Sequence, residues 1–332
     1  MNNAAGFINR DMKYLVDVLM PVYNHEKYVA QAIESIIGQK TNFPFRLVIG
    51  EDCSKDGSRA IIAQYAAAYP DKVFPVYHEH NLGAQGNGSY LCAVIEADYA
   101  CICEGDDYWI DEYKLQKQVD FLQANPDFSM CFTDVKIVDE LGHNKPWDHY
   151  FPKIEKDVLT IDDFILSYMS IIPTPTIMFR NVLPRPLPPF YIKTISADIC
   201  IQLMVADKGK TKYLPDTTAV YRNHSGGITK SDDAIARTYD LRIDMYEEAN
   251  EFFGFRYNAQ FRTQLLHMIK VRMIYGSREL NLVSKMKNFS RNFGKYLKYS
   301  DKVNVKEILY YTGVLFFPSV LKTIGKKSTK EA

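Results

Sequence analysis

Glu104, Asp106 and Asp107 place three carboxylates within four residues, directly after the apolar run of residues 99–103. Carboxylates held this close repel one another, and a bound cation removes that cost. The apolar run predicts a buried strand, so the acidic residues stand where that strand ends. The pattern predicts a divalent metal site, and a metal at this place indicates a substrate that carries phosphate.

A second acidic pair, Glu51 and Asp52, follows the apolar run of residues 45–49. Strand and helix patterns alternate with short links from residue 15 to residue 135, which is typical of a parallel, doubly wound α/β sheet. Such sheets bind ligands beyond the carboxyl ends of their strands. We therefore expect both acidic groups to lie at one edge of the sheet.

The elements that must position these residues follow from hydrophobic periodicity and from breakers. We expect the first strand to stop at Pro21, Asn24 to cap the helix that follows, and Pro75 to place its strand at an edge. The predicted strands are residues 15–20, 45–49, 73–77, 99–103, 128–135 and 211–214. The first predicted helix has apolar positions at helical spacing from Tyr28 to Ile37. The others run from about 58 to 69, from the turn-rich segment 81–88 to about 97, from about 111 to 124, and from residues 196–198 to about 209.

Composition bounds the class of protein. The chain has 332 residues, of which 47% are hydrophobic and 24% are charged, as in an ordinary globular protein. Its formal net charge is zero, which argues against a nucleic-acid partner. Six cysteines without a CxxC spacing predict reduced, structural thiols and a cytoplasmic protein. We expect no signal peptide and no membrane span, since no apolar run reaches about 20 residues.

The second half of the chain changes character. Residues 136–193 are proline-rich and irregular, and beyond residue 230 two long helical patterns cover residues 234–253 and 258–278. We expect a catalytic domain at 1–230 and a helical region at 231–332. The apolar and aromatic segment 308–321 is followed by lysines, which is typical of contact with a membrane surface. Packing on the catalytic domain or on a second copy in a homo-oligomer is the alternative.

Five segments in this order and spacing resemble the family 2 glycosyltransferases. They are residues 18–24, 51–58, 104–109, 196–198 and 221–227. The resemblance covers residues 14 to about 228. It implies a GT-A fold, with a mainly parallel sheet flanked by helices, and sugar transfer from a nucleoside diphosphate sugar to a hydroxyl group, usually with inversion. A UDP-sugar is the expected donor, a glycan or a lipid-linked molecule the acceptor, and Mn²⁺ or Mg²⁺ the cofactor.

The resemblance also assigns the reactive groups. Asp106 would be the principal metal ligand, and His224 would complete the metal shell or contact the diphosphate. Asp198 would be the catalytic base. Its place at the start of a predicted helix would equally suit an N-cap, and the helix dipole there would keep it ionised.

The remaining residues would contact the donor or the acceptor. Glu104 occupies a position where the family usually has Asp, so its direct ligation of the metal is in question. Trp109 would form the acceptor-side wall, or else pack in the core. The residues expected at the nucleotide sugar are Pro21, Tyr23, Asn24, Asp52, Glu104, Gly105 and Asp107.

Two other functions fit part of the pattern. A sugar nucleotidyltransferase of similar fold would favour a glycine-rich, basic loop after the first strand, where this chain has Pro21 to Asn24. A non-catalytic nucleotide-sugar-binding module would not need Asp52, Asp106 and Asp198 together. The sequence therefore predicts a glycosyltransferase of cell-surface polysaccharide synthesis, cytoplasmic or peripheral at the inner face of the cell membrane.

Overall fold

The computed structural model describes residues 14–146, 151, 154–167, 170–224, 232–276 and 282–300, with residues 304, 306, 307, 309 and 312. The chain divides into two compact units. Unit 1 consists of Met1–Phe164, Met169–Ile192 and Ser196–Gly226. Unit 2 consists of Ile165–Tyr168, Lys193–Ile195 and Gly227–Ala332.

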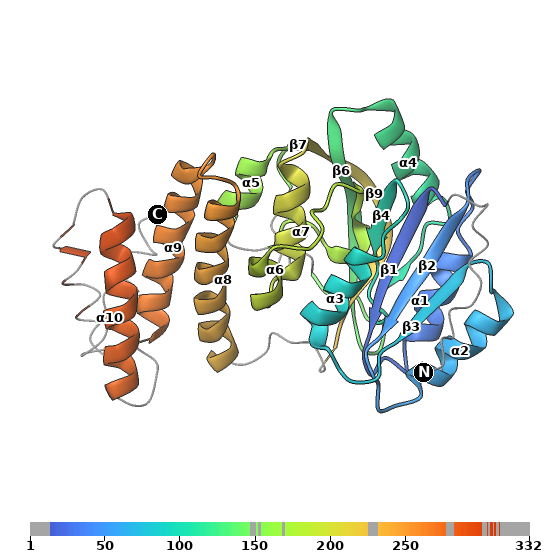
Figure 1. The fold of residues 1–332 in the computed structure, drawn as a ribbon, viewed down its shortest axis with the longest axis horizontal. Helices are drawn as coiled ribbons and strands as arrows, with labels where there is room; N and C mark the ends of the chain where they lie inside the picture. Colours follow the sequence, from blue (N-terminus) through green and yellow to red (C-terminus); the bar gives the residue numbers. More distant parts are fainter. Residues whose placement is uncertain are drawn as a thin grey trace. The chain divides into compact units, whose positions relative to one another are not determined.

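Unit 1 is built on one nine-stranded sheet with the strand order β3-β2-β1-β4-β8-β6-β9-β5, and β7 pairs with β9 (Figure 1). The strands are β1 (Val16–Val22), β2 (Phe45–Glu51), β3 (Val73–Tyr77), β4 (Tyr99–Ile102), β5 (Tyr108–Trp109), β6 (Phe128–Asp139), β7 (Val158–Leu159), β8 (Met178–Arg180) and β9 (Lys210–Asn223). The helices of this part of the chain are α1 (Val29–Ile37), α2 (Ser58–Ala68), α3 (Gly83–Ala93), α4 (Lys114–Ala124), α5 (Ile161–Leu166), η2 (Thr174–Thr176), α6 (Pro189–Lys193) and α7 (Ala197–Ala206).

The strands β3, β2, β1 and β4 are parallel neighbours, with Val18 of β1 beside Leu47 of β2 and Cys101 of β4. All three of these side chains are fully buried. Helix α1 contributes Val29, Ala32, Ile33 and Ile36 to the same core, at helical spacing. Burial of each valine, leucine or isoleucine side chain stabilises the fold by about 1.5–3 kcal/mol. This core holds the parallel strands in register, and the acidic residues follow the ends of those strands.

The predicted fold class, a mainly parallel α/β sheet flanked by helices, is confirmed, and β3 with Pro75 lies at the edge as expected. Two local predictions were wrong. Strand β1 continues through Pro21 to Val22. Proline has no N–H to donate, but β4 already ends at Ile102, so β4 offers no acceptor that this N–H would have bonded. Helix α1 begins only at Val29, and Asn24 adopts a left-handed conformation (φ 57°) in the preceding loop.

The proline-rich segment 136–193 contains two short strands, β7 and β8, that the sequence did not predict. Strand β8 lies between β4 and β6 and is antiparallel to both. Strands β6 and β9 are long parallel neighbours with three register shifts, and the short strands β5 and β7 pair with β9. Strand β9 thereby carries its last residues to the carboxyl edge of the parallel strands.

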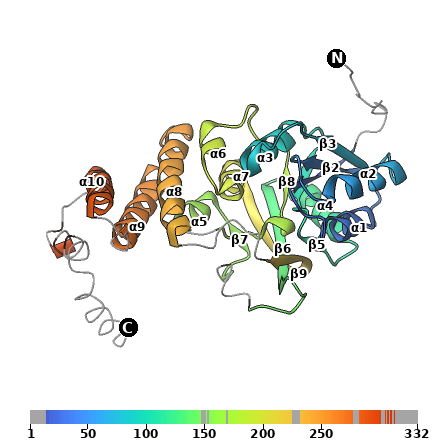
Figure 2. The same ribbon diagram turned by 90° about the horizontal axis from the view of Figure 1, so that it is seen from below.

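Unit 2 contains three long helices, α8 (Asp232–Phe252), α9 (Asn258–Gly276) and α10 (Leu282–Tyr299), with α9 between the other two (Figure 2). A bidentate ion pair between Arg272 and Asp240 joins α9 to α8. None of the described helices is long and apolar enough to cross a membrane. The predicted membrane-contact segment 308–321 lies outside the described residues, apart from Leu309 and Thr312.

All six cysteines are free thiols, and five of them are buried. This agrees with the prediction of reduced, structural cysteines. Burial raises the pKa of the Cys101 thiol to about 11, so that thiol is protonated at neutral pH.

Candidate active site

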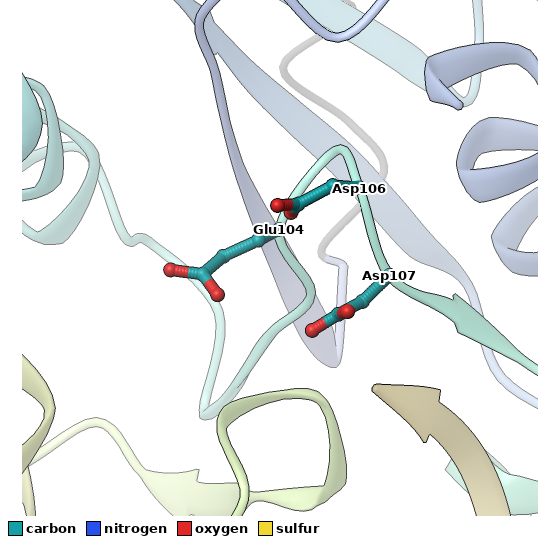
Figure 3. A group of neighbouring side chains, drawn as sticks. All are labelled: Glu104, Asp106 and Asp107. Carbon is teal, nitrogen blue, oxygen red and sulfur yellow. The ribbon is translucent and has the colours of Figure 1, made fainter. Parts of the chain in front are cut away.

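The acidic residues form the turn between β4 and β5. Cys103 N–H donates to Leu19 O at 3.0 Å, and Gly105 N–H donates to Pro21 O at 3.1 Å, so the turn is fastened to the end of β1. One carboxylate oxygen each from Glu104, Asp106 and Asp107 lies within 4.8 Å of the other two. The three side chains project to the same side of the turn (Figure 3).

Gly105 has a steric reason to be glycine. A Cβ atom at this position would lie 2.8 Å from His25 Nδ1 and 2.8 Å from Val22 Cγ2. Real Cβ contacts essentially never come this close, so a side chain at residue 105 would push the turn away from β1. Packing alone therefore explains why residue 105 is glycine, and the contact of Gly105 with the donor stays a prediction.

Asp106 faces two imidazoles. His224 Nε2 lies 2.8 Å from Asp106 Oδ2, and His25 Nε2 lies 3.7 Å from the same oxygen. Burial works to raise the pKa of Asp106, but the hydrogen bond with His224 and the nearby His25 outweigh it, and the net pKa is lowered. Burial lowers the pKa of His25, so its imidazole is favoured in the neutral form.

The other two carboxyls have raised pKa values. Asp107 is 2% exposed, and its pKa lies well above the usual value because of burial and then the charges of Asp106 and Glu104. Burial, followed by the charges of Asp106 and Asp198, raises the pKa of Glu104 to about 8. Both groups would ionise more readily if a cation were present.

Unfilled hydrogen-bonding capacity marks this site as one that suits a divalent cation. Among the described residues, the buried atoms without a hydrogen-bond partner include His25 Nδ1, Asp106 Oδ1 and Asp107 Oδ2. Buried polar atoms are nearly always partnered, so two such atoms in the acidic turn and a third in the adjacent His25 need an explanation. Carboxylate oxygens and imidazole nitrogens are ligands of divalent cations, and the residues present therefore fit a metal ion.

Arg222 holds the turn in place from β9. Its backbone N–H donates to Asp107 Oδ1 at 2.8 Å, and its Nε donates to Asp106 O at 2.9 Å. Its guanidinium lies over the rings of Tyr28 and Tyr108, at 4.6 and 5.2 Å from their centroids. The backbone and the guanidinium of Arg222 thus have partners within the protein.

Asp198 lies in the first turn of α7, half-buried, and Ser196 stands at the N-cap. The charge of Asp198 contributes to the raised pKa of Glu104, after burial and the charge of Asp106. A carboxylate in the first turn of a helix is stabilised in its ionised form by the helix dipole. An ionised carboxylate is chemically suited to act as a base.

The expected nucleotide-binding residues gather where β1 and β2 end. Asp52 is 2% exposed, and its Oδ1 accepts from Leu82 N–H at 2.7 Å. Asn24 Oδ1 accepts from Lys55 N–H at 2.8 Å, and Pro21 O accepts from Gly105 N–H. Tyr23 is 38% exposed, so its ring is open to a ligand.

Trp109 packs in the core and does not form an open acceptor-side wall. It is 4% exposed, and its Nε1 donates to Pro175 O at 2.8 Å. The fully buried Lys114 places its Nζ 4.4 Å from the Trp109 ring centroid and donates to Gln118 Oε1 at 2.6 Å. This corrects the expectation of an acceptor contact, since the indole has no free face toward solvent.

The sequence analysis did not predict that His25 lies beside Asp106 or that Arg222 donates hydrogen bonds to the acidic turn. His25 directly follows the segment that ends the first strand, so the rule that placed Asp52 and Asp106 at one edge could also have placed it there. The stacking of Arg222 could not be found in this way, because it depends on Tyr28 and Tyr108 from separate parts of the chain.

Residues 17–183, half of the chain, match the family model for glycosyl transferase family 2. The chain belongs to that family.

Relatives of similar sequence include a protein named as a glycosyltransferase. An uncharacterized protein of Mycobacterium tuberculosis is 33% identical over 210 residues, which are 63% of this chain and 59% of the relative. The chain thus matches less than two thirds of that relative's length. TuaG of Bacillus subtilis, named as a teichuronic acid biosynthesis glycosyltransferase, is 28% identical over 66% of this chain and 83% of its own length.

Two solved structures share the fold. TarS 1–349 of S. aureus, in complex with UDP-GlcNAc, superposes with a TM-score of 0.54 and 17% identity over 86% of this chain and 92% of that chain. The mannosyltransferase PcManGT of Pyrobaculum calidifontis, in complex with GDP-Man and Mn²⁺, gives a TM-score of 0.53 and 14% identity over 95% of this chain and 84% of that chain. At these identities the likeness concerns the fold alone.

Proposed function

We propose that this protein is a metal-dependent inverting glycosyltransferase that moves a sugar from a nucleoside diphosphate sugar to a hydroxyl group of a glycan or lipid-linked acceptor. The single observation that carries the proposal is the acidic turn, in which buried oxygens of Asp106 and Asp107 have no protein partner. The family and the donor-bound fold neighbours support a nucleotide-sugar substrate. We take a UDP-sugar as the first donor to test.

The residues of the turn would hold Mn²⁺ or Mg²⁺, with Asp106 as the principal ligand and His224 beside it. Such an ion neutralises the charge that develops on a departing diphosphate. Glu104 and Asp107 would face the donor, and Asp52, Asn24 and Tyr23 would bind the nucleoside. Pro21 would contribute backbone to the same pocket.

Asp198 would supply the base. It would accept the proton of the acceptor hydroxyl while that oxygen bonds to the anomeric carbon and the bond from that carbon to the diphosphate breaks. Attack from the face opposite the leaving group inverts the anomeric configuration. The nucleoside diphosphate would leave as the second product.

The setting that we propose is the synthesis of a cell-surface polysaccharide, as suggested by the name of the relative TuaG. The C-terminal tail would contact the inner face of the membrane. Deletion of residues 305–332 is expected to release the protein from vesicles of anionic lipid in a flotation assay. Unchanged flotation would contradict this part of the proposal.

The reaction is tested with a panel of UDP-, GDP- and dTDP-sugars and Mn²⁺, by release of the nucleoside diphosphate. The variant D198N is expected to lower turnover by about 10²–10⁴-fold, while nucleotide affinity stays within about twofold. The matched control is D162N, because Asp162 also lies in the first turn of a helix, α5. Full turnover by D198N would remove Asp198 as the base, and full turnover in excess chelator would remove the metal.

A further inference from the structure

His25 lies beside the acidic turn and has none of the roles described so far. Its side chain is 17% exposed, and its Nε2 lies 3.7 Å from Asp106 Oδ2. His224 Nε2 lies 2.8 Å from that same oxygen on another side. The other ring nitrogen of His25, Nδ1, is buried and has no hydrogen-bond partner.

The backbone of His25 is held by both neighbouring loops. Its N–H donates to Ser58 Oγ at 2.8 Å, and its C=O accepts from the N–H groups of Tyr28 and Val29, each at 2.9 Å. Hydrogen bonds at both the N–H and the C=O fix the backbone of His25 and so the direction of its Cα–Cβ bond. From this backbone the imidazole lies beside Asp106, with 17% of its side chain exposed.

Gly105 makes room for this imidazole. A Cβ at residue 105 would lie 2.8 Å from His25 Nδ1, so any other residue would displace the ring or the turn. The imidazole of His25 thus occupies the space that the absent side chain of Gly105 leaves free.

The distances suit three ligands of one ion. Ligand atoms roughly 2.1 Å from a cation and at right angles to each other lie roughly 3 Å apart, and wider angles give larger separations. The separations of 2.8 and 3.7 Å from Asp106 Oδ2 fall in this range. Glu104 and Asp107 offer further oxygens close by.

We propose that His25 is a third protein ligand of the divalent cation, together with Asp106 and His224. This inference rests on the metal-dependent transferase proposed above. It also sets the metal preference: Mg²⁺ favours oxygen ligands, whereas imidazole suits the transition metals. A site with two imidazoles is expected to prefer Mn²⁺ over Mg²⁺.

Pulsed EPR of the protein with Mn²⁺ alone counts the coupled ¹⁴N nuclei directly. The wild-type protein is expected to show couplings from two imidazoles, and H25F and H224F from one each. We expect H25F to weaken Mn²⁺ binding at least about tenfold and Mg²⁺ binding less. Phenylalanine keeps the ring volume, and H25Q serves as a second variant if H25F does not fold.

The control is H143F, because His143 has a 72% exposed side chain and pairs with Asp139, which is not part of the acidic turn. It should leave both the couplings and the affinity unchanged. A single imidazole coupling in the wild type, or an H25F variant with unchanged couplings and Mn²⁺ affinity, would overturn the role of His25. If D106N also bound Mn²⁺ as the wild type does, the proposed metal site itself would fail, which separates the two results.

Discussion

Buried carboxylates lie at both ends of the parallel strands, and the two ends differ in how many of the carboxylate oxygens have hydrogen-bond partners. Asp17, near the start of β1, is fully buried and accepts hydrogen bonds from Arg46 Nε and Nη2 and from the backbone N–H groups of Glu96 and Ala97. At the end of β4, Asp106 Oδ1 and Asp107 Oδ2 are buried without a partner. Burial alone therefore does not mark a functional carboxylate, whereas unfilled capacity does.

The energetic reason lies in the cost of desolvation. A buried carboxylate whose oxygens all accept hydrogen bonds needs no ligand to offset its desolvation. A buried oxygen without a partner costs folding free energy until a cation or a hydrogen-bond donor binds it. We therefore expect substitutions at Asp17 to act on folding, and substitutions at Asp106 to act on metal binding and turnover.

The largest expected effect is that of D106N on turnover. Loss of the principal ligand should reduce Mn²⁺-dependent donor cleavage by about 10²–10⁴-fold, since electrostatic stabilisation of this kind supplies several kcal/mol. In the presence of EDTA the variant should stay folded and lose less stability than D17N does, because Asp106 is only partly buried and is paired with His224 and His25. A variant that keeps its turnover, or that unfolds in EDTA, would erase the contrast with Asp17.

D17N should act in the opposite sense. It removes the buried charge that is paired with Arg46, which is 4% exposed and keeps the exposed Glu96 as an ionic partner, and breaking such a buried pair costs about 3–5 kcal/mol of unfolding free energy. Urea denaturation measures the loss. The exposed pair Lys40–Glu112 gives the control, and E112Q should cost less than about 1 kcal/mol. A D17N loss as small as that of E112Q would contradict the structural role.

Carboxyl groups with and without hydrogen-bonding partners should also differ in pH dependence. The pKa of Glu104 is raised from 4.5 to about 8 in the folded metal-free protein, so its contribution to stability is present below pH 4.5 and is lost as the pH rises through 8. E104Q should therefore flatten the fall in stability over this interval, measured by urea denaturation in EDTA. An unchanged slope would show that Glu104 is not held in the protonated form.

Glu51, at the end of β2, should show the reverse. Burial works to raise its pKa, but hydrogen bonds from Ser54 and Arg59 outweigh it and lower the pKa below 4.5. Its contribution is thus present above pH 4.5 and is lost as the pH falls through the folded pKa. The cost of E51Q should be full at neutral pH and shrink on acidification, and a cost independent of pH would argue against this account.

The smallest expected effect is that of R222K. Lysine keeps the charge but loses the planar stacking between Tyr28 and Tyr108 and the bond from Nε to Asp106 O. We expect a loss of about 1–2 kcal/mol in stability and a several-fold weaker Mn²⁺ affinity. Calorimetry measures both, and a fully wild-type affinity would mean that the turn keeps its shape without Arg222.

Much of the fold was predictable because local pattern and tertiary structure agree. The strands β1 to β4 are apolar runs between turns, and α8 and α9 match the predicted helical stretches. Strands β5 and β8 were not predictable, since they are two and three residues long and exist only through their antiparallel partners. The middle of β9 is polar and exposed, so only its start was predicted as a strand.

The site was predictable to the same extent. Residues that directly follow parallel strands, such as Asp52 and Asp106, could be placed at one edge from topology alone. The burial of Trp109 and the stacking of Arg222 could not, because both depend on contacts between segments far apart in the chain. The steric match of Gly105 with His25 likewise needs the distance between β1 and the acidic turn.

Calorimetric titration of Mn²⁺ in the presence of UDP or GDP tests the central claim most directly. We expect the wild-type protein to bind Mn²⁺ with a stoichiometry of about one, D106N to lose this binding, and D17N, wherever it is folded, to retain it. Binding of Mn²⁺ to D106N with wild-type affinity would contradict the claim that the unpartnered carboxylates after β4 form the metal site.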